Sequence, residues 1–392
     1  MSAARTGDHR RQRRAVTLAF LANGLAVASF LVRVPDVRDL LELREAALGV
    51  VLSGAAVGVI LGLVLSGSIA ARAGSRRLTL VGAATAMSVL PLTGLARSPV
   101  ILVLLLVLLG AGSAMMDVGM NAQGVGVERA YGRSIMLGFH GAWSLGALAA
   151  ALLGSLAMGA GVSVAAHLTA ISVLLLVLVL AAAGQRRVED RGRTTEPGPR
   201  FALPRGPLLP LALVAFAAAL GESAASDWSG LHLADELRVP PGQVGWGFAA
   251  ATAAMTVIRL VGDRLVRRVG PEPVVTIGGA FAVAGYLTVA LSTSLPLTLL
   301  AFAAVGAGLG VTVPLVFAAA GSRADSPGAG VAAVATVGYL AFLVGPPLVG
   351  VIADLFGLRT AFGVVAVIIG VMVLRPHPQL RPVTLDAEPV GR

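Results

Sequence analysis

The stretch "GQRRVEDRGRTTEPGPRFALPRGP", residues 184–207, is the only long polar break among the apolar runs of this 392-residue chain. On each side of it, apolar runs follow one another, and each is close to the roughly 20 residues that cross a bilayer core as a helix. The break divides the runs into two groups of six. The sequence therefore predicts an all-α polytopic membrane protein made of two six-helix bundles.

The composition supports a chain that is dissolved in lipid. Hydrophobic residues make up 56% and charged residues 13% of the chain, with a mean hydropathy of +0.87, whereas soluble domains carry about 25% charged residues. The 49 glycines suit close packing of helices in lipid. The absence of cysteine excludes disulfides and thiolate metal sites, and we expect neither a metal nor a cofactor.

Charged or Pro/Gly-rich breaks separate twelve candidate spans. We predict them at 15–34, 46–70, 78–96, 100–125, 134–158, 164–184, 208–231, 243–266, 274–293, 297–320, 330–353 and 360–375. The predicted organisation is an N-terminal bundle at 1–184, a cytoplasmic linker at 185–207, a C-terminal bundle at 208–375 and a cytoplasmic tail at 376–392. Residues 1–30 also have the basic and apolar segments of a signal peptide. We interpret them as the first span, because the repeat described below requires it.

The arginines indicate the orientation. With these spans, 23 of the 30 arginines fall on the side of the N-terminus, six fall on the opposite side, and Arg259 lies inside a span. The positive-inside rule then predicts that both termini are cytoplasmic. The net charge of +10 does not point to a nucleic-acid partner, because the basic residues lie in short loops between apolar runs.

An internal repeat relates the two bundles. A shift of 196 residues superimposes features of the first bundle on the second over four spans. The matches include Leu48-Gly49 with Val244-Gly245, Arg72 and Gly74 with Arg268 and Gly270, Gly82 with Gly278, and Gly110 and Gly112 with Gly306 and Gly308. Two parallel repeats of six spans are one way in which secondary transporters are built.

At these residues the chain resembles the major facilitator superfamily. The loop "GSIAARAGSRR" (67–77) resembles the signature between its second and third spans, although Ala71 stands where an acid is usual, and "GDRLVRRVGPEP" (262–273) is the counterpart. "RVPD" (33–36), "DVGMN" (117–121), "GFHGAWSLG" (138–146), "GESAASDW" (221–228) and "GPPLVGVIAD" (345–354) resemble the bacterial fucose-permease-like group.

This resemblance implies a monomeric, non-enzymatic transporter in the bacterial cytoplasmic (inner) membrane, with a small-molecule substrate, protons and the lipid bilayer as its partners. It implies proton coupling through Asp117, whereas Leu31 stands where that group has a first-span acid. Drug or metabolite efflux is the alternative within transport. A non-transporting receptor or an intramembrane enzyme is less favoured, because the chain has no soluble domain or catalytic cluster. It also has no lysine for a phosphate-binding loop.

Ionisable residues at membrane depth are costly and therefore predict function. For proton coupling we predict Asp117, Glu222 and His140. Asp117 and Asn121 share one face of the fourth span, and His140 is expected at a similar depth in the fifth. The pair either relays protons or forms a static hydrogen bond at the cytoplasmic gate.

Other polar and aromatic residues of the spans predict a substrate cavity and its gates. The cavity set is Asn121, Trp143, Ser144, Ser226, Asp227, Trp228, Thr256 and Arg259, and the gating set is Arg33, Asp36, Arg72, Asp263, Pro314 and Pro346. Arg259 either pairs with Asp263 one turn away or binds an anionic group. Trp228 lines an outer vestibule or anchors the helix at the membrane interface. Trp143 either stacks on a sugar ring or simply packs. Arg33 and Asp36 are expected to form an outer-gate ion pair.

Overall fold

The computed structural model describes residues 3–132, 135–183, 203–324 and 326–381. Helices account for the regular structure of these residues, and no strand occurs among them. Most of the predicted linker and most of the predicted tail lie outside the described residues.

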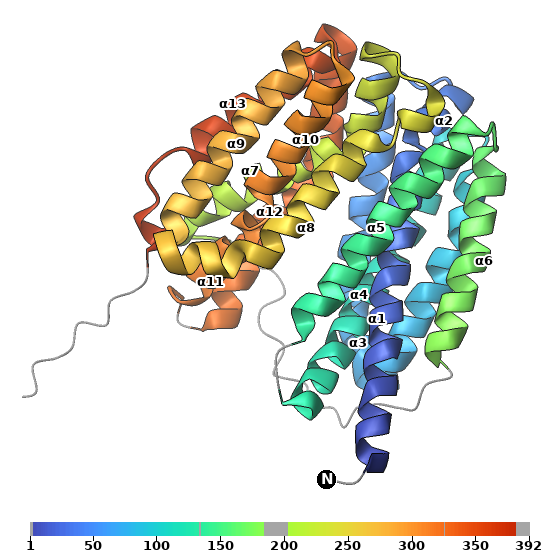
Figure 1. Cartoon of the computed structure of the whole chain (residues 1–392), viewed down its shortest axis with the longest axis vertical. Helices are drawn as coiled ribbons and strands as arrows, with labels where there is room; N and C mark the ends of the chain where they lie inside the picture. Colours follow the sequence, from blue (N-terminus) through green and yellow to red (C-terminus); the bar gives the residue numbers. More distant parts are fainter. Residues whose placement is uncertain (1–2, 133–134, 184–202, 325, 382–392) are drawn as a thin grey trace, which may run out of the picture.

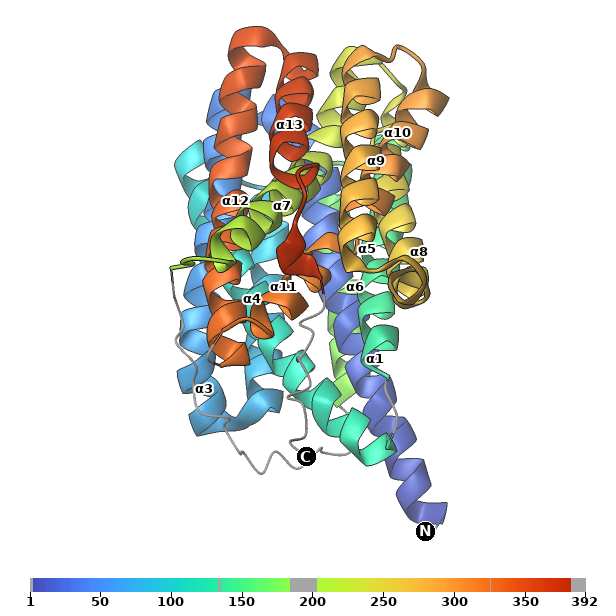
Figure 2. The same cartoon turned by 90° about the vertical axis from the view of Figure 1, so that its left-hand side faces the viewer.

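Two helical bundles stand side by side (Figures 1 and 2). The first contains α1 (Ala3–Val32), α2 (Val34–Leu40), α3 (Glu45–Thr93), α4 (Pro99–Tyr131), α5 (Met136–Gly159) and α6 (Val164–Ala183). The second contains α7 (Leu208–Leu231), the π turn η1 (His232–Glu236), the 3-10 turn η2 (Pro241–Gln243), α8 (Trp246–Val269), α9 (Pro271–Leu291), α10 (Leu295–Leu309), α11 (Thr312–Gly321), α12 (Pro327–Phe356), α13 (Leu358–Val373) and the 3-10 turn η3 (Pro378–Leu380). The bundles meet mainly through α3 with α12 and α5 with α8.

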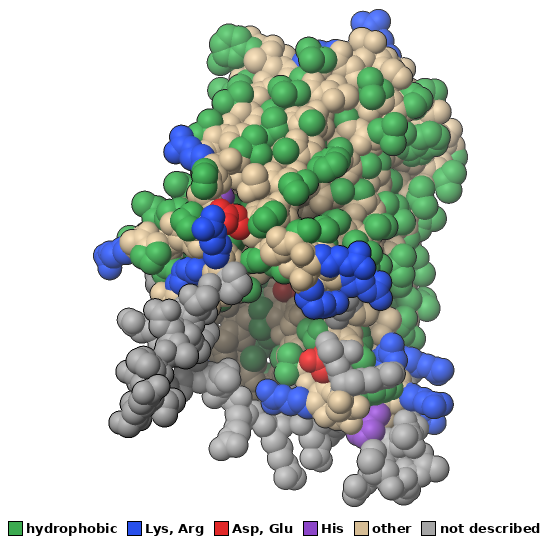
Figure 3. Space-filling view, turned by 60° about the vertical axis from the view of Figure 1, so that its left-hand side comes forward, with side chains coloured by type: hydrophobic (Ala, Val, Ile, Leu, Met, Phe, Trp, Pro, Cys, Tyr) green, Lys and Arg blue, Asp and Glu red, His purple; other side chains and the backbone are tan. Residues whose placement is uncertain are grey.

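Ten helices among the described residues are long and apolar enough to cross a membrane. The sequence predicts two spans within α3, which counts as one helix here although its backbone turns at Gly74. The helix α13 is apolar but shorter, with 16 residues. Large exposed hydrophobic side chains cover the outside of both bundles (Figure 3), as expected for a surface in contact with lipid.

Glycines 196 residues apart have the same conformation in the two bundles. Gly74 turns the backbone within α3 with φ 79° and ψ 162°, and Gly270 turns it between α8 and α9 with φ 87° and ψ 161°. Both values lie in a region that side chains with a Cβ rarely adopt. The sharp turns therefore require glycine at both positions.

Glycines 196 residues apart also make the same helix contacts. A Cβ on Gly110 would lie 2.1 Å from the carbonyl oxygen of Ala55, and one on Gly306 would lie 2.0 Å from that of Ala251. The missing side chains let the backbones of α4 and α10 approach α3 and α8 closely, as in other helices packed in lipid. The register of the sequence repeat is thus also the register of these contacts.

The bundles are joined at one end and separated at the other. We call the end where α1 begins the arginine-rich end, and the end that carries α2 and η1 the closed end. At the closed end Arg38 pairs with Asp235 across the bundles, and the Gly245 N–H donates to Ser155 Oγ at 3.1 Å. At the arginine-rich end the surface is hollowed between the bundles (Figure 3). The protein is therefore open toward the arginine-rich end.

Candidate functional site

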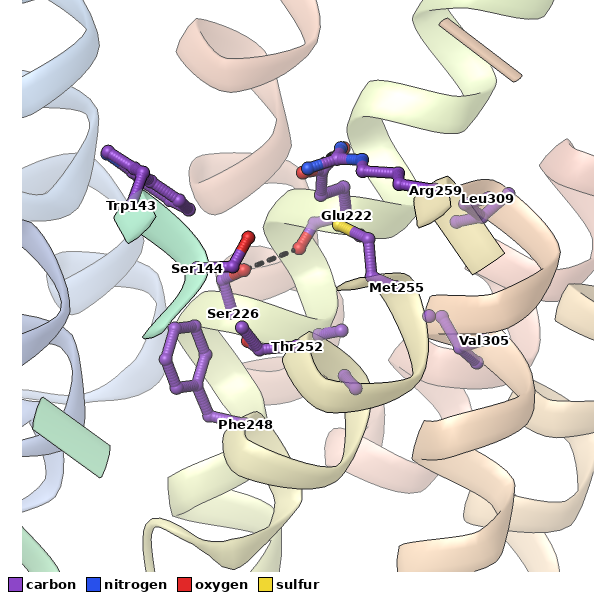
Figure 4. A pocket seen from close by; sticks show the side chains of 13 residues that line it. Trp143, Ser144, Glu222, Ser226, Phe248, Thr252, Met255, Arg259, Val305 and Leu309 are labelled. Atoms are coloured by element: carbon purple, nitrogen blue, oxygen red, sulfur yellow. Dashed lines mark hydrogen bonds and ion pairs between the residues drawn. The ribbon is translucent and has the colours of Figure 1, made fainter. Parts of the chain in front are cut away.

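Two cavities, each lined by residues of both bundles, share two charged residues. The larger, which we call the open cavity, has a volume of about 580 Å³ and is lined mainly by α7, α8, α11 and α12, with His140 of α5. The smaller, the deep pocket, has a volume of about 40 Å³ and lies between α5, α7, α8 and α10 (Figure 4). Glu222 and Arg259 line both. This pair therefore stands at the junction of the two cavities.

Glu222 is carried by α7, which packs through a nearly continuous row of small buried residues. The Tyr286 hydroxyl of α9 donates to the carbonyl oxygen of Gly221, the residue before Glu222. The Ser226 hydroxyl donates to the main-chain carbonyl of Glu222 at 2.8 Å. These bonds hold the backbone and leave the Glu222 carboxylate directed toward Arg259 (Figure 4), with a distance of 3.6 Å between Oε1 and Nη2.

Arg259 is held by a carbonyl that a proline leaves free. Its Nε donates to the Gly310 carbonyl oxygen at 2.9 Å, at the break between α10 and α11. In a continuous helix this carbonyl would accept from the N–H of residue 314, but residue 314 is proline and has no N–H. The described contacts of Arg259 thus go to Gly310 and Glu222, not to Asp263, which lines the open cavity.

The deep pocket has a polar and an apolar wall. Trp143 and Ser144 enter it from α5, Ser226 from α7 and Thr252 from α8 (Figure 4). The apolar wall comprises Phe248, Met255, Val305 and Leu309. Thr256, also predicted for the cavity, donates to the Thr252 carbonyl at 2.8 Å and does not line the deep pocket.

Asn23 orients the Trp143 ring and was missed by the sequence reasoning. The Trp143 Nε1–H donates to Asn23 Oδ1 at 2.9 Å, and Asn23 Nδ2 donates to the Ser113 hydroxyl at 3.2 Å. Asn23 is only 3% exposed, so this network joins α1, α4 and α5 inside the first bundle. A single asparagine within the apolar first span was the available signal.

Asp117 and His140 are not joined by any described contact. Asn121 Nδ2 donates to Asp117 Oδ1 at 3.0 Å within α4, and Asp117 lies near enough to Tyr339 of α12 to interact electrostatically. His140 instead lines the open cavity and meets the Phe20 ring edge-on at 5.2 Å. The two residues that were expected to act as a pair face different surroundings here.

Two predicted cavity residues of α7 point elsewhere. Asp227 accepts a hydrogen bond from Ser223 at 2.7 Å and does not line either cavity. Trp228 has no exposed surface, and its Nε1 has no hydrogen-bond partner. Trp228 is thus neither an interfacial anchor nor part of a vestibule wall in this conformation, because α7 is enclosed by its neighbours on this face.

Arg33 and Asp36 form the expected ion pair, but it does not join the bundles. Their side chains lie 2.7 Å apart, and Arg33 also donates to the Val162 carbonyl of the same bundle. Arg38 pairs with Asp235 across the bundles, and the hydrogen bonds that Arg38 donates to Asp235 raise the pKa of Arg38. Arg44 also lies 3.9 Å from Asp354 of the second bundle. The gating role expected of Arg33 and Asp36 stays a prediction.

The π turn η1 directs two consecutive acidic side chains toward two different arginines. Asp235 contacts Arg38 of the other bundle, whereas Glu236 accepts from the Arg359 Nε of α13 at 2.7 Å. A π turn contains one more residue per hydrogen-bonded turn than an α-helix, and such turns are common at functional sites. The turn thus ties α7 to both bundles at the closed end.

The remaining gating residues have three different surroundings. Arg72 is exposed beside the turn at Gly74. Pro346 lies within α12, where its carbonyl oxygen would be 2.3 Å from a Cβ on Gly49 of α3. Pro314 lines the open cavity at the start of α11, so the bend expected there is present as the break between α10 and α11.

Known proteins resemble this chain over nearly its whole length. An uncharacterized MFS-type transporter of Yersinia pestis is 35% identical over 356 residues, covering 90% of this chain and 91% of that protein. The membrane protein MosC of Rhizobium meliloti is 33% identical over 365 residues, covering 92% and 88%. A sequence profile of the Major Facilitator Superfamily matches residues 16–341 and 211–389.

Solved structures of low sequence identity share the fold. A mutant of the nucleoside transporter NupG superimposes with a TM-score of 0.79 at 13% identity, covering 93% of this chain and 98% of that one. A bacterial homolog of the human lysosomal transporter Spinster, in an inward-facing and occupied conformation, gives 0.75 at 15% identity, covering 92% and 94%. The finer resemblance to fucose permease stays a prediction. With its apolar helices, its two bundles and these relatives, the chain is a multi-pass membrane protein that belongs to the major facilitator superfamily of transporters.

Proposed function

We propose that this protein is a secondary transporter that moves a small polar solute by alternating access, and that it has no enzymatic activity. In this proposal twelve spans form two parallel six-span repeats, at 1–184 and 208–375, joined by a linker at 185–207 and followed by a tail at 376–392. The ten long apolar helices among the described residues give twelve spans when α3 is counted as two spans and the shorter helix α13 is added.

The observation that carries this proposal is the position of Glu222 and Arg259. The pair lies at the junction of the deep pocket and the open cavity, between a closed end held by Arg38 and Asp235 and a hollow at the arginine-rich end. A solute site between two bundles that are joined at one end only is the arrangement on which alternating access operates.

We also propose that transport is coupled to protons through Asp117 and Glu222, with His140 lining the same cavity as Glu222. Carboxylates at membrane depth are expensive and are retained for ion or substrate pathways. Glu222 is 29% exposed beside the cavities, and Asp117 is exposed on α4. Glu222 lines both cavities, and Asp117 lies near Tyr339, which lines the open cavity; these positions support proton coupling through the two acids.

The proposed setting is a bacterial cytoplasmic membrane, with the protein as a monomer and the arginine-rich end in the cytoplasm. The support is the distribution of arginines, which favours a cytoplasmic position for that end, and the bacterial origin of the relatives. With this orientation the structure is open to the inside.

The experiment is gradient-driven uptake into liposomes that contain the purified full-length protein. Labelled sugars, nucleosides and amino acids are screened with and without an imposed pH gradient, and Asp117→Asn and Glu222→Gln are compared with Glu42→Gln, which alters an exposed acid at the closed end. We expect accumulation by the wild type and by the control, and its loss in both test variants. Transport is rejected if no solute moves under any gradient, and coupling through these acids is rejected if both variants still respond to the gradient.

A further inference from the structure

Glu222 and Arg259 form a loose pair whose hydrogen-bonding groups are largely unused. The 3.6 Å between Arg259 Nη2 and Glu222 Oε1 is longer than a hydrogen bond. The two side chains are 32% and 29% exposed, respectively, beside the cavities. A pair at this distance and exposure is weak, so a ligand that binds between the two side chains disrupts little interaction energy.

Each member of the pair has donors or acceptors to spare. The Arg259 Nε is used by the Gly310 carbonyl, so its two terminal amino groups have, among the described contacts, only the long approach to Glu222. The Glu222 carboxylate accepts no described hydrogen bond, because the Ser226 hydroxyl donates to the main-chain carbonyl instead. The site thus offers a planar cationic fork beside an anionic acceptor.

A solute that carries both charges matches this arrangement. Its carboxylate accepts two parallel hydrogen bonds from the guanidinium, and its ammonium group donates to the Glu222 carboxylate. A solute with one charge leaves either Arg259 or Glu222 without a counter-ion once it occupies the space between them. A neutral polyol can form hydrogen bonds with the same two residues. Only the protein partner of each bond is then charged, so each bond is weaker than one between two charged groups.

The deep pocket next to the pair accommodates the rest of such a solute. Phe248, Met255 and Leu309 offer an apolar surface, and Ser144 and Thr252 contribute hydroxyls to the same pocket. With a volume of about 40 Å³, this pocket has room for a short side chain but not for an aromatic ring. The charged groups of the solute then remain at the junction, where the open cavity admits them.

We propose that the transported solute is a small zwitterion with adjacent ammonium and carboxylate groups, as in an amino acid, bound between Arg259 and Glu222. This inference rests on the proposed transport function and names its substrate class. An ammonium group and a proton compete for the Glu222 carboxylate and therefore occupy it in turn, whereas Asp117 remains available for a proton while the solute is bound.

The test is a charge-matched binding series on the purified full-length protein. For alanine, serine and leucine, the free amino acid is compared with its N-acetyl derivative, its amide and its N-acetyl amide, which are zwitterion, anion, cation and neutral form; glucose and myo-inositol are added as neutral polyols. Binding is measured by isothermal titration calorimetry. We expect at least one free amino acid to bind about 10- to 100-fold more tightly than its three derivatives, the ratio expected for loss of a charge-assisted contact.

Variants separate charge recognition from general damage. Glu222→Gln and Arg259→Gln are expected to weaken binding of that amino acid about 10- to 100-fold. The matched controls Glu42→Gln and Arg97→Gln, which alter exposed residues at the closed end, are expected to leave it unchanged. The proposal is overturned if no free amino acid binds, if an N-acetyl amide or a polyol binds as tightly, or if both Gln variants retain full affinity.

The outcome is distinguishable from failure of the proposed function. If a neutral sugar accumulates in liposomes under a pH gradient and no amino acid does, the transport function stands and the zwitterion inference fails. If an amino acid binds with the expected charge dependence and no solute crosses the bilayer, the inference about the site stands and transport fails.

Discussion

The Nε of Arg259 donates a hydrogen bond to the carbonyl of Gly310, which is the carbonyl that the missing N–H of Pro314 leaves unpaired. A helix break thus fixes one edge of a guanidinium and directs its other edge toward Glu222. The proline that the sequence marks as a bend has a second role, because it supplies the acceptor that positions the charge.

Pro314→Ala restores an N–H that competes for the Gly310 carbonyl and extends α11 toward α10. We expect solute affinity to fall about 3- to 10-fold, since the Arg259 fork loses part of its anchor. Isothermal titration calorimetry with the transported solute provides the measurement. Pro99→Ala, at the first position of α4, is the matched control, and equal affinities of the two variants would contradict the role given to Pro314.

Arg38→Ala removes the pair that joins the bundles at the closed end and is expected to let that end open more often. The chain has no cysteine, so a single cysteine at position 155, where Ser155 Oγ now accepts from Gly245, reports opening by its maleimide labelling rate. We expect a rise of about 2- to 5-fold, the effect of a partly exposed ion pair. Arg97→Ala serves as the control, and an unchanged rate in Arg38→Ala would show that the pair does not hold this end.

The pH dependence of stability is expected to include a contribution from His377. Burial lowers the pKa of this histidine, which is 4% exposed and precedes η3. A lowered folded-state pKa gives stability that is present above the ordinary pKa of about 6.5 and is lost as the pH falls through the folded value. The melting temperature of the wild type should therefore fall more than that of His377→Leu below about pH 6.5.

The His377 comparison has a direct control. Leu374→Ala alters an exposed residue close to His377 in sequence without changing a titratable group, and it should keep the pH dependence of the wild type. If the melting temperatures of the wild type and of His377→Leu fall equally with decreasing pH, the contribution assigned to His377 is contradicted.

Asn23→Leu leaves the Trp143 indole N–H and the Ser113 hydroxyl without their shared partner inside the first bundle. Loss of such buried hydrogen bonds costs about 1–3 kcal/mol, so we expect a lower melting temperature and weaker solute binding through a freed Trp143 ring. Asn23→Gln keeps both functional groups and should retain most of each property. An unchanged melting temperature in Asn23→Leu would contradict the structural role of this network.

Gly110→Ala and Gly306→Ala should destabilise the protein to a similar extent, because each methyl group meets a main-chain carbonyl that cannot rotate away. We expect about 1–3 kcal/mol for each, as for other overpacked sites. Gly363→Ala, where nothing lies within 4 Å of the added Cβ, is the control. Unequal losses at Gly110 and Gly306 would show that the contacts are not equivalent in solution.

The sequence predicts most of the features that follow from the spacing of residues along the chain. Run lengths predict the helices, and the 196-residue register places Gly74 and Gly270 at equivalent turns. The sequence also marks Glu222 as functional from the cost of an ionisable group in lipid, and it includes Ser144 and Ser226 in the cavity set; all three line the deep pocket.

Contacts between residues on different helices could not be predicted in the same way. One-turn spacing allows Asp263 as a partner of Arg259, whereas the contact goes to Glu222 on another helix. Trp228 is enclosed because α7 is buried on more faces than its composition indicates. Helical periodicity defines a face but not which helix covers it, so contacts such as Arg38 with Asp235 require the structure.

The extra residue of the π turn η1 determines which arginine each of its acids meets. Deleting one residue between His232 and Glu236 would restore α-helical spacing and rotate the following side chains by about 100°. Asp235 would turn away from Arg38, and Glu236 would turn away from Arg359. A single-codon deletion in this turn would thus break the contacts to Arg38 and Arg359 together, although α7 would still pack against α12 and α13.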